Sequence, residues 1–444
     1  MTAERDTIFA LSSGRPPAAI AVVRISGPAA RGALQATCGR IPAPRQATFA
    51  RLTDPETREL IDEALVLWFP APRSETGEDM AELQVHGGRA ILARLFTVLR
   101  QLEGFRPAEV GEFTRRAFNN GRLDLTEVEG LGDLINADTE AQRRQALRQF
   151  KGLLGVQAET WRTRLIDVLA LIEASIDFSD EGDVPVDLLK RAFAGIGPLA
   201  QEIGEAQGGQ GERLREGLVV AIAGPPNVGK STLLNRVARR EAAIVSPYAG
   251  TTRDVIEVAL DLAGFPVILR DTAGMRETAD PVEQEGLRRA QRAMADADLV
   301  LWVVDPTTAA APVPDQAAEC WVVLNKADLP AAGNTIALWS GVHRSLTISA
   351  RTGAGIDALI EAIGAFGERF FTAAPVMVTR ERHRVALQEA KEALDAALQL
   401  GPGGAEELIA EQVRLAAGAM GRLTGRVGVE DILEVIFRDF CIGK

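Results

Sequence analysis

The chain has 444 residues and a formal net charge of −12, from 49 Lys and Arg against 61 Asp and Glu. This acidic balance excludes strong non-specific binding to nucleic acid, so any contact with RNA should be local or shared with a partner. Apolar residues make up 46% of the chain, which excludes a disordered polymer and supports two or three folded domains.

Three cysteines lie far apart in the sequence, at Cys38, Cys320 and Cys441. Their odd number and wide spacing argue against a disulfide framework and favour a reducing compartment. The first residues carry acidic side chains and no apolar signal segment, and no apolar run approaches bilayer-spanning length. We therefore expect a cytoplasmic protein.

Residues 1–118 alternate between short strand-like runs and helical runs. Strands are predicted at 18–25, 64–69 and 81–85, each bounded by Pro, Gly or charged residues. This pattern is typical of a compact α+β domain. Arg24, Glu82 and His86 stand near the ends of these strands and could line a pocket, although a solvated role is the commoner one for each residue alone.

Residues 119–213 and 374–444 have helical periodicity. Trp161, Leu165 and Val168 recur on one helix face, and the sequence from Thr126 to Glu129 matches a capping box that would begin a helix. Because helical sequence flanks residues 214–373 on both sides, we expect an α/β domain inserted into one discontinuous helical domain.

The central domain begins with a phosphate-binding loop. Residues 224–231 read GPPNVGKS, the pattern GxxxxGK[ST], between a buried strand at 218–223 and a helix at 232–239. Glycines allow the backbone N–H groups to approach a phosphate, and the helix N-terminus adds partial positive charge. Lys230 is expected to contact the β- and γ-phosphates, and the Ser231 hydroxyl to bind Mg²⁺.

Four more elements follow in the order that a GTPase requires. Thr252 is expected at Mg²⁺ and the γ-phosphate, and Asp271 and Gly274 of the sequence DTAG at the metal shell and the γ-phosphate. In the sequence NKAD, Asp328 can accept both N–H groups of a guanine edge, which selects GTP over ATP. Finally, the backbone of residues 348–350 can contact guanine O6. Five such elements in order predict a GTPase.

The position after DTAG departs from Ras-type enzymes. Ras-type enzymes place there a Gln that orients water, but this chain has Met275, so another group must act, with acids available at positions 277, 280, 283 and 285. The charge of an arginine finger could come from a bound cation beside Asn227. A local turn role for Asn227 is equally compatible with the spacing.

These motifs resemble the tRNA-modification GTPase MnmE (TrmE) family. The resemblance includes GPPNVGKS, AIVSPYAGTTRD (243–254), DTAGMRE (271–277), NKAD (325–328) and a terminal CIGK (441–444), and extends to IAVVRISG (20–27), ELQVHGG (82–88) and GEFTRRAFNNGRLDL (111–125). It implies an α/β and α+β multidomain fold. An N-terminal folate-transferase-like α+β domain would mediate dimerisation, next to a discontinuous helical domain with an inserted Ras-like P-loop GTPase domain.

The resemblance also implies a set of site residues. Glu283 would help to orient water, and K⁺ would replace the arginine finger. Cys441 matches a Cys needed for modification, as a nucleophile or as a structural thiol. The implied K⁺ ligands are Asn227 and the backbone carbonyls of Ser246, Tyr248 and Thr251, the Mg²⁺ ligands are Ser231 and Thr252, and the folate residues are Arg24, Glu82, Arg122 and Lys444. The implied GTP-binding residues are Asn227, Val228, Gly229, Lys230, Ser231, Thr232, Ser246, Pro247, Tyr248, Ala249, Gly250, Thr251, Thr252, Asp271, Thr272, Ala273, Gly274, Asn325, Lys326, Asp328, Ser349 and Ala350.

The function implied is K⁺-dependent GTP hydrolysis coupled to wobble-uridine modification in tRNA. A homodimer would act in a heterotetramer or larger complex with an FAD-containing partner of the MnmG (GidA) type. A tetrahydrofolate, in its 5,10-methylene or 5-formyl form, would donate one carbon. The alternatives are a ribosome-assembly switch of the Era or Der kind, which lacks the N-terminal domain and the terminal Cys-x-Gly-Lys, and a scaffold that only binds nucleotide. One departure is the Pro-, Ala- and Thr-rich sequence at 306–319, which leaves little room for a full helix.

Overall fold

The computed structural model describes residues 6–177, 184–208, 210–240, 256–272, 293–307, 319–330, 344–372 and 377–427, with Leu433, Ile436, Phe437, Phe440 and Gly443. The chain forms two compact units. The first comprises residues 1–132, 149–164 and 417–444, and the second comprises residues 133–148 and 165–416. The predicted domain boundaries at 118, 213 and 373 stay a prediction.

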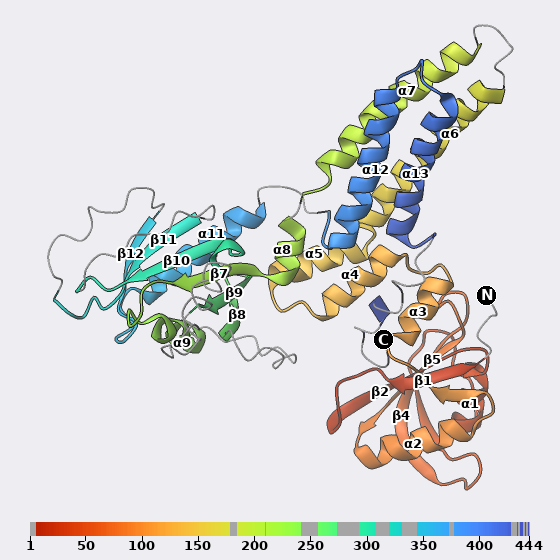
Figure 1. Cartoon of the computed structure of the whole chain (residues 1–444). Helices are drawn as coiled ribbons and strands as arrows, with labels where there is room; N and C mark the ends of the chain where they lie inside the picture. Colours follow the sequence, from red (N-terminus) through yellow and green to blue (C-terminus); the bar gives the residue numbers. More distant parts are fainter. Residues whose placement is uncertain are drawn as a thin grey trace, which may run out of the picture. The chain divides into compact units, whose positions relative to one another are not determined.

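The first unit contains a six-stranded sheet that is antiparallel except where β1 pairs with β6. Residues 21, 23 and 25 of the central strand β2 are buried while Arg24 is only partly exposed, and the strand predicted at 18–25 is confirmed. The buried side chains pack against helices α1 (Ala30–Cys38) and α2 (Arg89–Gln101) (Figure 1). In sheet order the strands are β3 (Thr48–Thr53), β4 (Leu60–Phe69), β5 (Met80–Gly87), β2 (Ala18–Ser26), β1 (Thr7–Leu11) and β6 (Phe105–Pro107).

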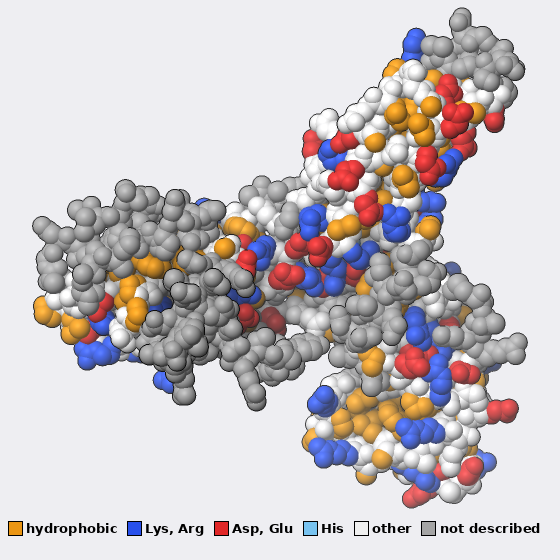
Figure 2. All heavy atoms as spheres, in the orientation of Figure 1, with side chains coloured by type: hydrophobic (Ala, Val, Ile, Leu, Met, Phe, Trp, Pro, Cys, Tyr) orange, Lys and Arg blue, Asp and Glu red, His pale blue; other side chains and the backbone are white. Residues whose placement is uncertain are grey.

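On the opposite face of this sheet, Phe113 of helix α3 (Glu112–Asn119) packs against Ile8 and Ala10 of β1, while other apolar side chains are exposed. Ile20, Phe49 and Leu65 are 62%, 57% and 44% exposed there. Figure 2 shows hydrophobic side chains gathered over the region of β2 and β4, with Lys and Arg side chains beside them. A cluster of large exposed apolar side chains on one face of a sheet is typical of an interaction surface.

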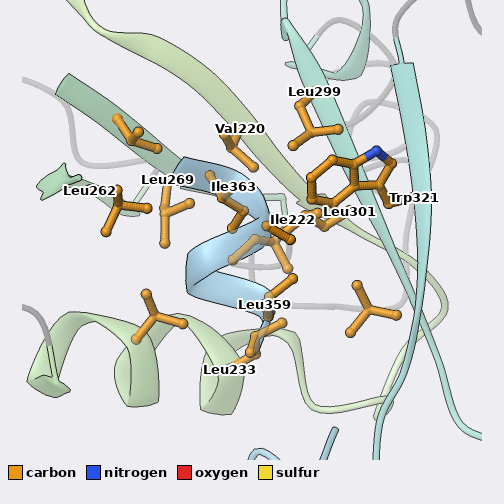
Figure 3. Packing of buried hydrophobic residues seen from close by; sticks show 14 of the residues in the cluster. Val220, Ile222, Leu233, Leu262, Leu269, Leu299, Leu301, Trp321, Leu359 and Ile363 are labelled. Atoms are coloured by element: carbon orange, nitrogen blue, oxygen red, sulfur yellow. The ribbon is translucent and has the colours of Figure 1, made fainter. Parts of the chain in front are cut away.

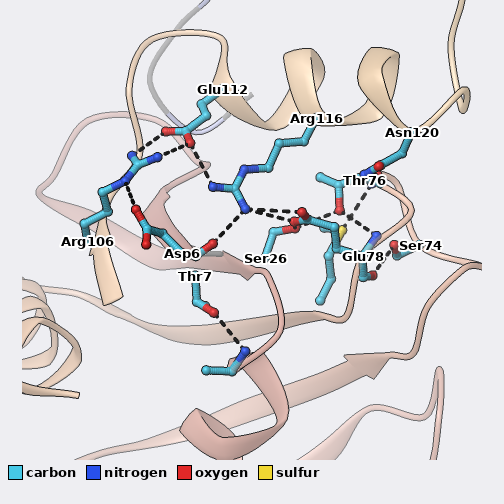
Figure 4. A network of polar contacts seen from close by, with 12 residues as sticks. Asp6, Thr7, Ser26, Ser74, Thr76, Glu78, Arg106, Glu112, Arg116 and Asn120 are labelled. Atoms are coloured by element: carbon cyan, nitrogen blue, oxygen red, sulfur yellow. Dashed lines mark hydrogen bonds and ion pairs between the residues drawn. The ribbon is translucent and has the colours of Figure 1, made fainter. Parts of the chain in front are cut away.

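A buried ionic network joins the sheet to helix α3 (Glu112–Asn119) (Figure 4). Arg116, whose side chain is 2% exposed, donates to Glu112 at 2.9 Å, to Glu78 at 3.1 Å and to the backbone carbonyl of Asp6 at 2.9 Å. Arg106 donates to the same Glu112 carboxylate at 2.6 Å. One guanidinium therefore ties together the chain start, the helix and the loop between β4 and β5.

The carboxyl of Glu112 stays ionised in this network. Burial alone would raise the pKa of Glu112, but hydrogen bonds from Arg106, the backbone N–H of Glu109 and Arg116 outweigh it and lower the pKa to about 2. Glu78 extends the network, because it also accepts the hydroxyl of Ser26 at 2.8 Å. The loop that carries Glu78 is thus held to β2 by charged hydrogen bonds, which are stronger than neutral ones.

Helical segments precede and follow the second sheet along the sequence. Trp161, Leu165 and Val168 are buried on one face of α6, as their spacing predicts. Helices α7 and α12 pack against each other. The helices are α4 (Leu125–Ile135), α5 (Glu140–Phe150), α6 (Leu153–Asp177), α7 (Val184–Glu205), α8 (Gln210–Glu216), α12 (Glu381–Leu400) and α13 (Glu406–Thr424). None of the helices in the described ranges has the length and apolar character needed to cross a membrane.

The capping box predicted from Thr126 to Glu129 is wrong by two residues. The Asp124 carboxylate accepts the backbone N–H of Glu127 at 2.9 Å, and the Glu127 carboxylate accepts that of Asp124 at 2.8 Å. The earlier start places Leu125, which is fully buried, in the first turn. Thr126 instead donates its hydroxyl to Asp124 at 2.7 Å. Two overlapping capping boxes, Asp124 to Glu127 and Thr126 to Glu129, fit the sequence, and the burial of Leu125 favours the one that begins at Asp124.

The second unit contains a sheet that is parallel except for β8, which pairs antiparallel with β9. Strand β7 is buried along its whole length, as expected for a parallel strand covered on both faces. Figure 3 shows Leu233 of α9 (Lys230–Arg240) and Leu359 and Ile363 of α11 (Ile356–Thr372) beside Ile222 of β7. In sheet order the strands are β12 (Arg344–Thr347), β11 (Glu319–Leu324), β10 (Leu299–Val304), β7 (Leu218–Ala223), β9 (Phe265–Asp271) and β8 (Ile256–Leu262).

We predict that Arg116→Met destabilises the first unit by about 3 kcal/mol, because its removal takes the counter-charge from Glu78 and leaves the buried Glu112 with Arg106 alone. Faster amide hydrogen exchange in β1, β2 and α3 would report the loss. Arg115→Met is the matched control. The Arg115 side chain, next to Arg116 in the sequence, is 34% exposed and pairs with Glu109 at the surface, so the expected cost is below about 1 kcal/mol. Equal exchange in the two variants would contradict a stabilising role for the network.

Candidate functional site

The phosphate loop follows β7 and ends at the first residue of α9. Gly224 has φ +139°, and a Cβ there would lie 2.2 Å from the Val303 carbonyl oxygen, so only glycine fits. The Lys230 ammonium donates to the carbonyls of Gly224 and Pro225, each at 2.8 Å. These bonds curl the loop around the lysine, and the helix N-terminus at the start of α9 is suited to an anion.

Asn325 connects this loop to the loop at residues 349–355. Its side-chain amide donates to the Val228 carbonyl at 2.7 Å, and its amide oxygen accepts the backbone N–H of Ala350 at 2.9 Å. Asn325 is 3% exposed. A Cβ at Gly229 would come within 2.4 Å of the Asn325 amide nitrogen. Three segments far apart in the sequence are therefore held in one close arrangement by a buried amide.

The predicted metal ligands come together where β7 and β9 end. Ile222 and Asp271 are register partners, and the Ser231 hydroxyl donates to the buried Asp271 carboxylate at 2.6 Å. Thr272 holds the end of β9 by donating its hydroxyl to the Ile222 carbonyl at 2.9 Å. A hydroxyl beside a carboxylate at a phosphate loop is a donor set that suits Mg²⁺. The other predicted ligand, Thr252, lies outside the described residues.

The expected base-recognition residues also meet. The Asp328 carboxylate accepts the hydroxyl of Ser349 and two N–H groups of Arg351. The hydrogen bond from Ser349 and then those from Arg351 lower the pKa of Asp328, so this carboxylate is ionised at neutral pH. Lys326, with φ +66°, donates to Asp305 at 2.6 Å. Thr232 follows Ser231 in α9.

The sequence reasoning missed Arg351 and Asp305. Arg351 directly follows Ser349 and Ala350, and a charged side chain next to these predicted base-binding residues was the signal that could have revealed it. Asp305 follows β10, and its pairing with Lys326 depends on a strand neighbour that the sequence does not reveal. Both predicted catalytic residues, Glu283 and Cys441, lie outside the described residues, as do Ser246, Pro247, Tyr248, Ala249, Gly250, Thr251, Ala273, Gly274 and Lys444. Their roles stay predictions.

The first unit has a second polar site on the face of its sheet that α3 partly covers. Arg24 of β2 donates to Glu82 of β5 at 3.1 and 3.2 Å and pairs with Glu75 at 2.7 Å. Its guanidinium lies 5.8 Å from the centre of the Phe113 ring. A Cβ at Gly77 would meet the Arg122 side chain at 3.2 Å, so Arg122 lies against the loop that carries Glu75.

The C-terminal tail reaches the same sheet. The Ser12 hydroxyl donates to the Gly443 carbonyl at 2.7 Å. Gly443 has φ +100°, and a Cβ there would lie 2.3 Å from the Leu11 carbonyl oxygen. Leu11 pairs with Val23, and Ala10 pairs with Arg24. The structure thus brings the residue before Lys444 to the strand beside Arg24. His86, also considered for this pocket, instead pairs with Asp62 at 2.8 Å.

Two family models together match most of the chain. A family model described as "MnmE helical domain" matches residues 125–441, and one described as "GTP-binding protein TrmE N-terminus" matches residues 7–122. The tRNA modification GTPase MnmE of Bradyrhizobium sp. (strain ORS 278) is 57% identical over 99% of both chains. The chain belongs to the tRNA modification GTPase MnmE family. The protein of the same name from Rhodopseudomonas palustris (strain BisB18) is 55% identical over 100% of both chains.

Among solved structures, the G domain of the T. maritima FeoB iron transporter is 21% identical and covers 33% of this chain and 98% of its own, with a TM-score of 0.23. That score carries no argument. The family match, the sheet order and the phosphate loop together make this chain an enzyme, a GTPase of tRNA modification. The predicted multidomain fold is confirmed.

We predict that Gly229→Ala abolishes measurable GDP binding. The added methyl meets the Asn325 amide, and the φ of +97° at this position is strained for alanine. Titration calorimetry with GDP measures the loss. Gly264→Ala is the control, because it has φ +85° in the turn between β8 and β9 but its Cβ would contact nothing closer than 3.7 Å. Wild-type affinity in Gly229→Ala would refute the arrangement around Asn325.

Proposed function

We propose that this chain is a K⁺-dependent GTP hydrolase that acts with an FAD-containing partner of the MnmG type on the wobble uridine of certain tRNAs. A tetrahydrofolate, in its 5,10-methylene or 5-formyl form, supplies the one-carbon unit, and C5 of the uridine receives an aminomethyl or carboxymethylaminomethyl group. The observation that carries this proposal is similarity to family members over 99% of the chain, which includes both the nucleotide site and the N-terminal site.

The nucleotide site supports binding of GTP through its own residues. Lys230 and the loop N–H groups bind the phosphates, and Asp328 accepts the guanine N–H edge. Ser231 and Asp271 would hold Mg²⁺, which would supply positive charge beside the phosphates. The residues themselves orient the nucleotide, and their contacts exist before it arrives, which lowers the cost of ordering the site.

The K⁺ requirement is proposed for the rim of the phosphate loop. Asn227 has φ +61° and is exposed, so its amide oxygen is free to turn toward a cation beside the phosphates. The backbone carbonyls of residues 246, 248 and 251 would complete that site. Glu283 would hold the attacking water, because Met275 has no polar atom for this task.

We expect GTP turnover of the purified chain to rise at least about tenfold when Na⁺ is replaced by K⁺ at constant ionic strength, since a charge next to the departing phosphate replaces an arginine finger. Glu283→Ala should lose the K⁺-stimulated turnover but keep GDP affinity. Phosphate release and GDP titration measure the two quantities. Equal rates in Na⁺ and K⁺, with the dimer at saturating GTP, would contradict the proposal.

The N-terminal site supports binding of a folate. Glu82 is half-buried beside Arg24, and a carboxylate there can accept the N–H edge of a pterin. Arg122 and Lys444 are a basic pair suited to the glutamate tail. Gly443 lies on the strand next to β2, which supports a role for its neighbour Lys444 and for Cys441 near this site.

The proposed homodimer uses the exposed apolar part of the sheet face that lies opposite α1 and α2. The exposed Ile20, Phe49 and Leu65 lie on that face, and a second copy would remove them from water. The acidic net charge agrees with tRNA contacts shared with the MnmG partner in a heterotetramer or larger complex. We propose the cytoplasm as the location, where tRNA, GTP and folate are all present.

We predict that Glu82→Gln prevents binding of 5-formyltetrahydrofolate to the full chain, because the amide replaces one of the two carboxylate oxygens that face the pterin N–H groups with an NH2 donor. In cells that lack this protein, nucleoside mass analysis should show wobble uridines without the C5 group, and Glu82→Gln should fail to restore them. Glu59→Gln, at an exposed turn of the same domain, is the control that should restore them. Normal nucleosides in the deletion strain would instead favour a ribosome-assembly switch.

A further inference from the structure

Arg351 holds the carboxylate that we assign to guanine recognition. Its Nε and Nη2 atoms donate to one oxygen of Asp328 at 3.0 and 2.5 Å, while the other oxygen accepts the Ser349 hydroxyl. The Asp328 side chain is 13% exposed, whereas the Arg351 side chain is 75% exposed. The guanidinium therefore covers this carboxylate from the solvent side.

The backbone beneath Arg351 is fixed. Arg236 of α9 donates to the carbonyls of both Ala350 and Arg351. The Ser349 N–H donates to the Ala354 carbonyl at 2.8 Å, and the Thr352 N–H donates to the Ser349 hydroxyl at 3.1 Å. The loop thus has a set shape, and the exposed Arg351 side chain can move over Asp328 without a change in that shape.

The chemistry of the contact matches that of the proposed ligand. A guanine edge offers the ring N1–H and the exocyclic amino group, both attached to one carbon. A guanidinium offers two N–H groups on one carbon in the same planar arrangement. Guanine and Arg351 therefore compete for the same carboxylate.

We propose that Arg351 acts as an internal substitute for the guanine edge, pairing with Asp328 and swinging into solvent when a guanine nucleotide binds. This inference rests on the proposed role of Asp328. It makes Arg351 a residue that sets nucleotide affinity. Only the fraction of the protein in which Arg351 has left Asp328 accepts GTP or GDP, and the apparent association rate is reduced in proportion to that fraction.

The expected size of the effect follows from the exposure of the pair. Solvent-exposed ion pairs shift a population only modestly, and two N–H donors on one carboxylate oxygen place this pair toward the upper end, so removal should raise the association rate about two- to sixfold. The dissociation rate should stay unchanged, because Arg351 lies in solvent in the bound form. Salt screens such a pair, so the difference from wild type should shrink in 1 M KCl.

The test uses stopped-flow kinetics of the full chain with N-methylanthraniloyl-GDP. Arg351→Ala should show the faster association, and Arg351→Lys should lie between, since an ammonium keeps the charge but loses the planar fork. Arg369→Ala removes another exposed arginine of the same unit, 3.9 Å from Glu319, and should match wild type. An unchanged association rate in Arg351→Ala would overturn the proposal. Faster dissociation would also overturn it, because it would mean that Arg351 packs on the bound base.

A second arm separates this inference from the role of Asp328. Asp328→Asn should shift preference from labelled GDP toward labelled XDP, because an amide pairs with the xanthine edge. If that preference does not shift, the assignment of Asp328 to the base is wrong, and the inference falls with it. If it shifts while Arg351→Ala associates like wild type, only the inference about Arg351 is wrong.

Discussion

The nucleotide site depends on one buried amide. Asn325 donates to the phosphate loop and accepts from the loop at residues 349–355, so it fixes the distance between the ends that would hold phosphate and base. A buried amide that lost either partner would carry the full desolvation cost of an unpaired polar group. The close approach of Gly229 to Asn325 has the same origin. The rigid spacing of the site thus comes from satisfying a single side chain.

Much of this site follows from the sequence because its parts are local. Lys230 and Ser231 are placed by a strand, a tight loop and a helix start that lie within 14 consecutive positions from 218 to 231, and glycines mark the turns. Asp271 and Asn325 each come at or directly after the end of a strand whose apolar run is visible in the sequence. Parallel strands bring such ends to one edge, so their meeting could be expected.

The contacts of Arg116 and Arg351 could not be predicted in the same way. Arg116 looks like an ordinary helical arginine until the sheet places Glu78 and Asp6 around it. Arg351 looks like a solvated residue until β11 and the following turn bring Asp328 to it. The misplaced capping box has a related cause, since the choice between Asp124 and Thr126 depended on the burial of Leu125. In each case a tertiary contact decides between local patterns that are nearly equivalent.

The two proposed ligand sites share one chemical arrangement. Arg24 donates Nε and Nη2 to a single oxygen of Glu82, and Arg351 donates the same two atoms to a single oxygen of Asp328. Guanine and pterin present the same 2-amino-4-oxopyrimidine edge, so both carboxylates are suited to one kind of ligand edge and both are held by a guanidinium of the same form. The surroundings differ: Arg24 is only 16% exposed and is shared with Glu75, while Arg351 is open to solvent. A buried, doubly paired guanidinium is costly to displace, so at the N-terminal site the ligand must bind around Arg24, whereas at Asp328 the side chain can leave. The same pairing of guanidinium and carboxylate therefore holds Arg24 fixed in the first unit and leaves Arg351 able to move in the second.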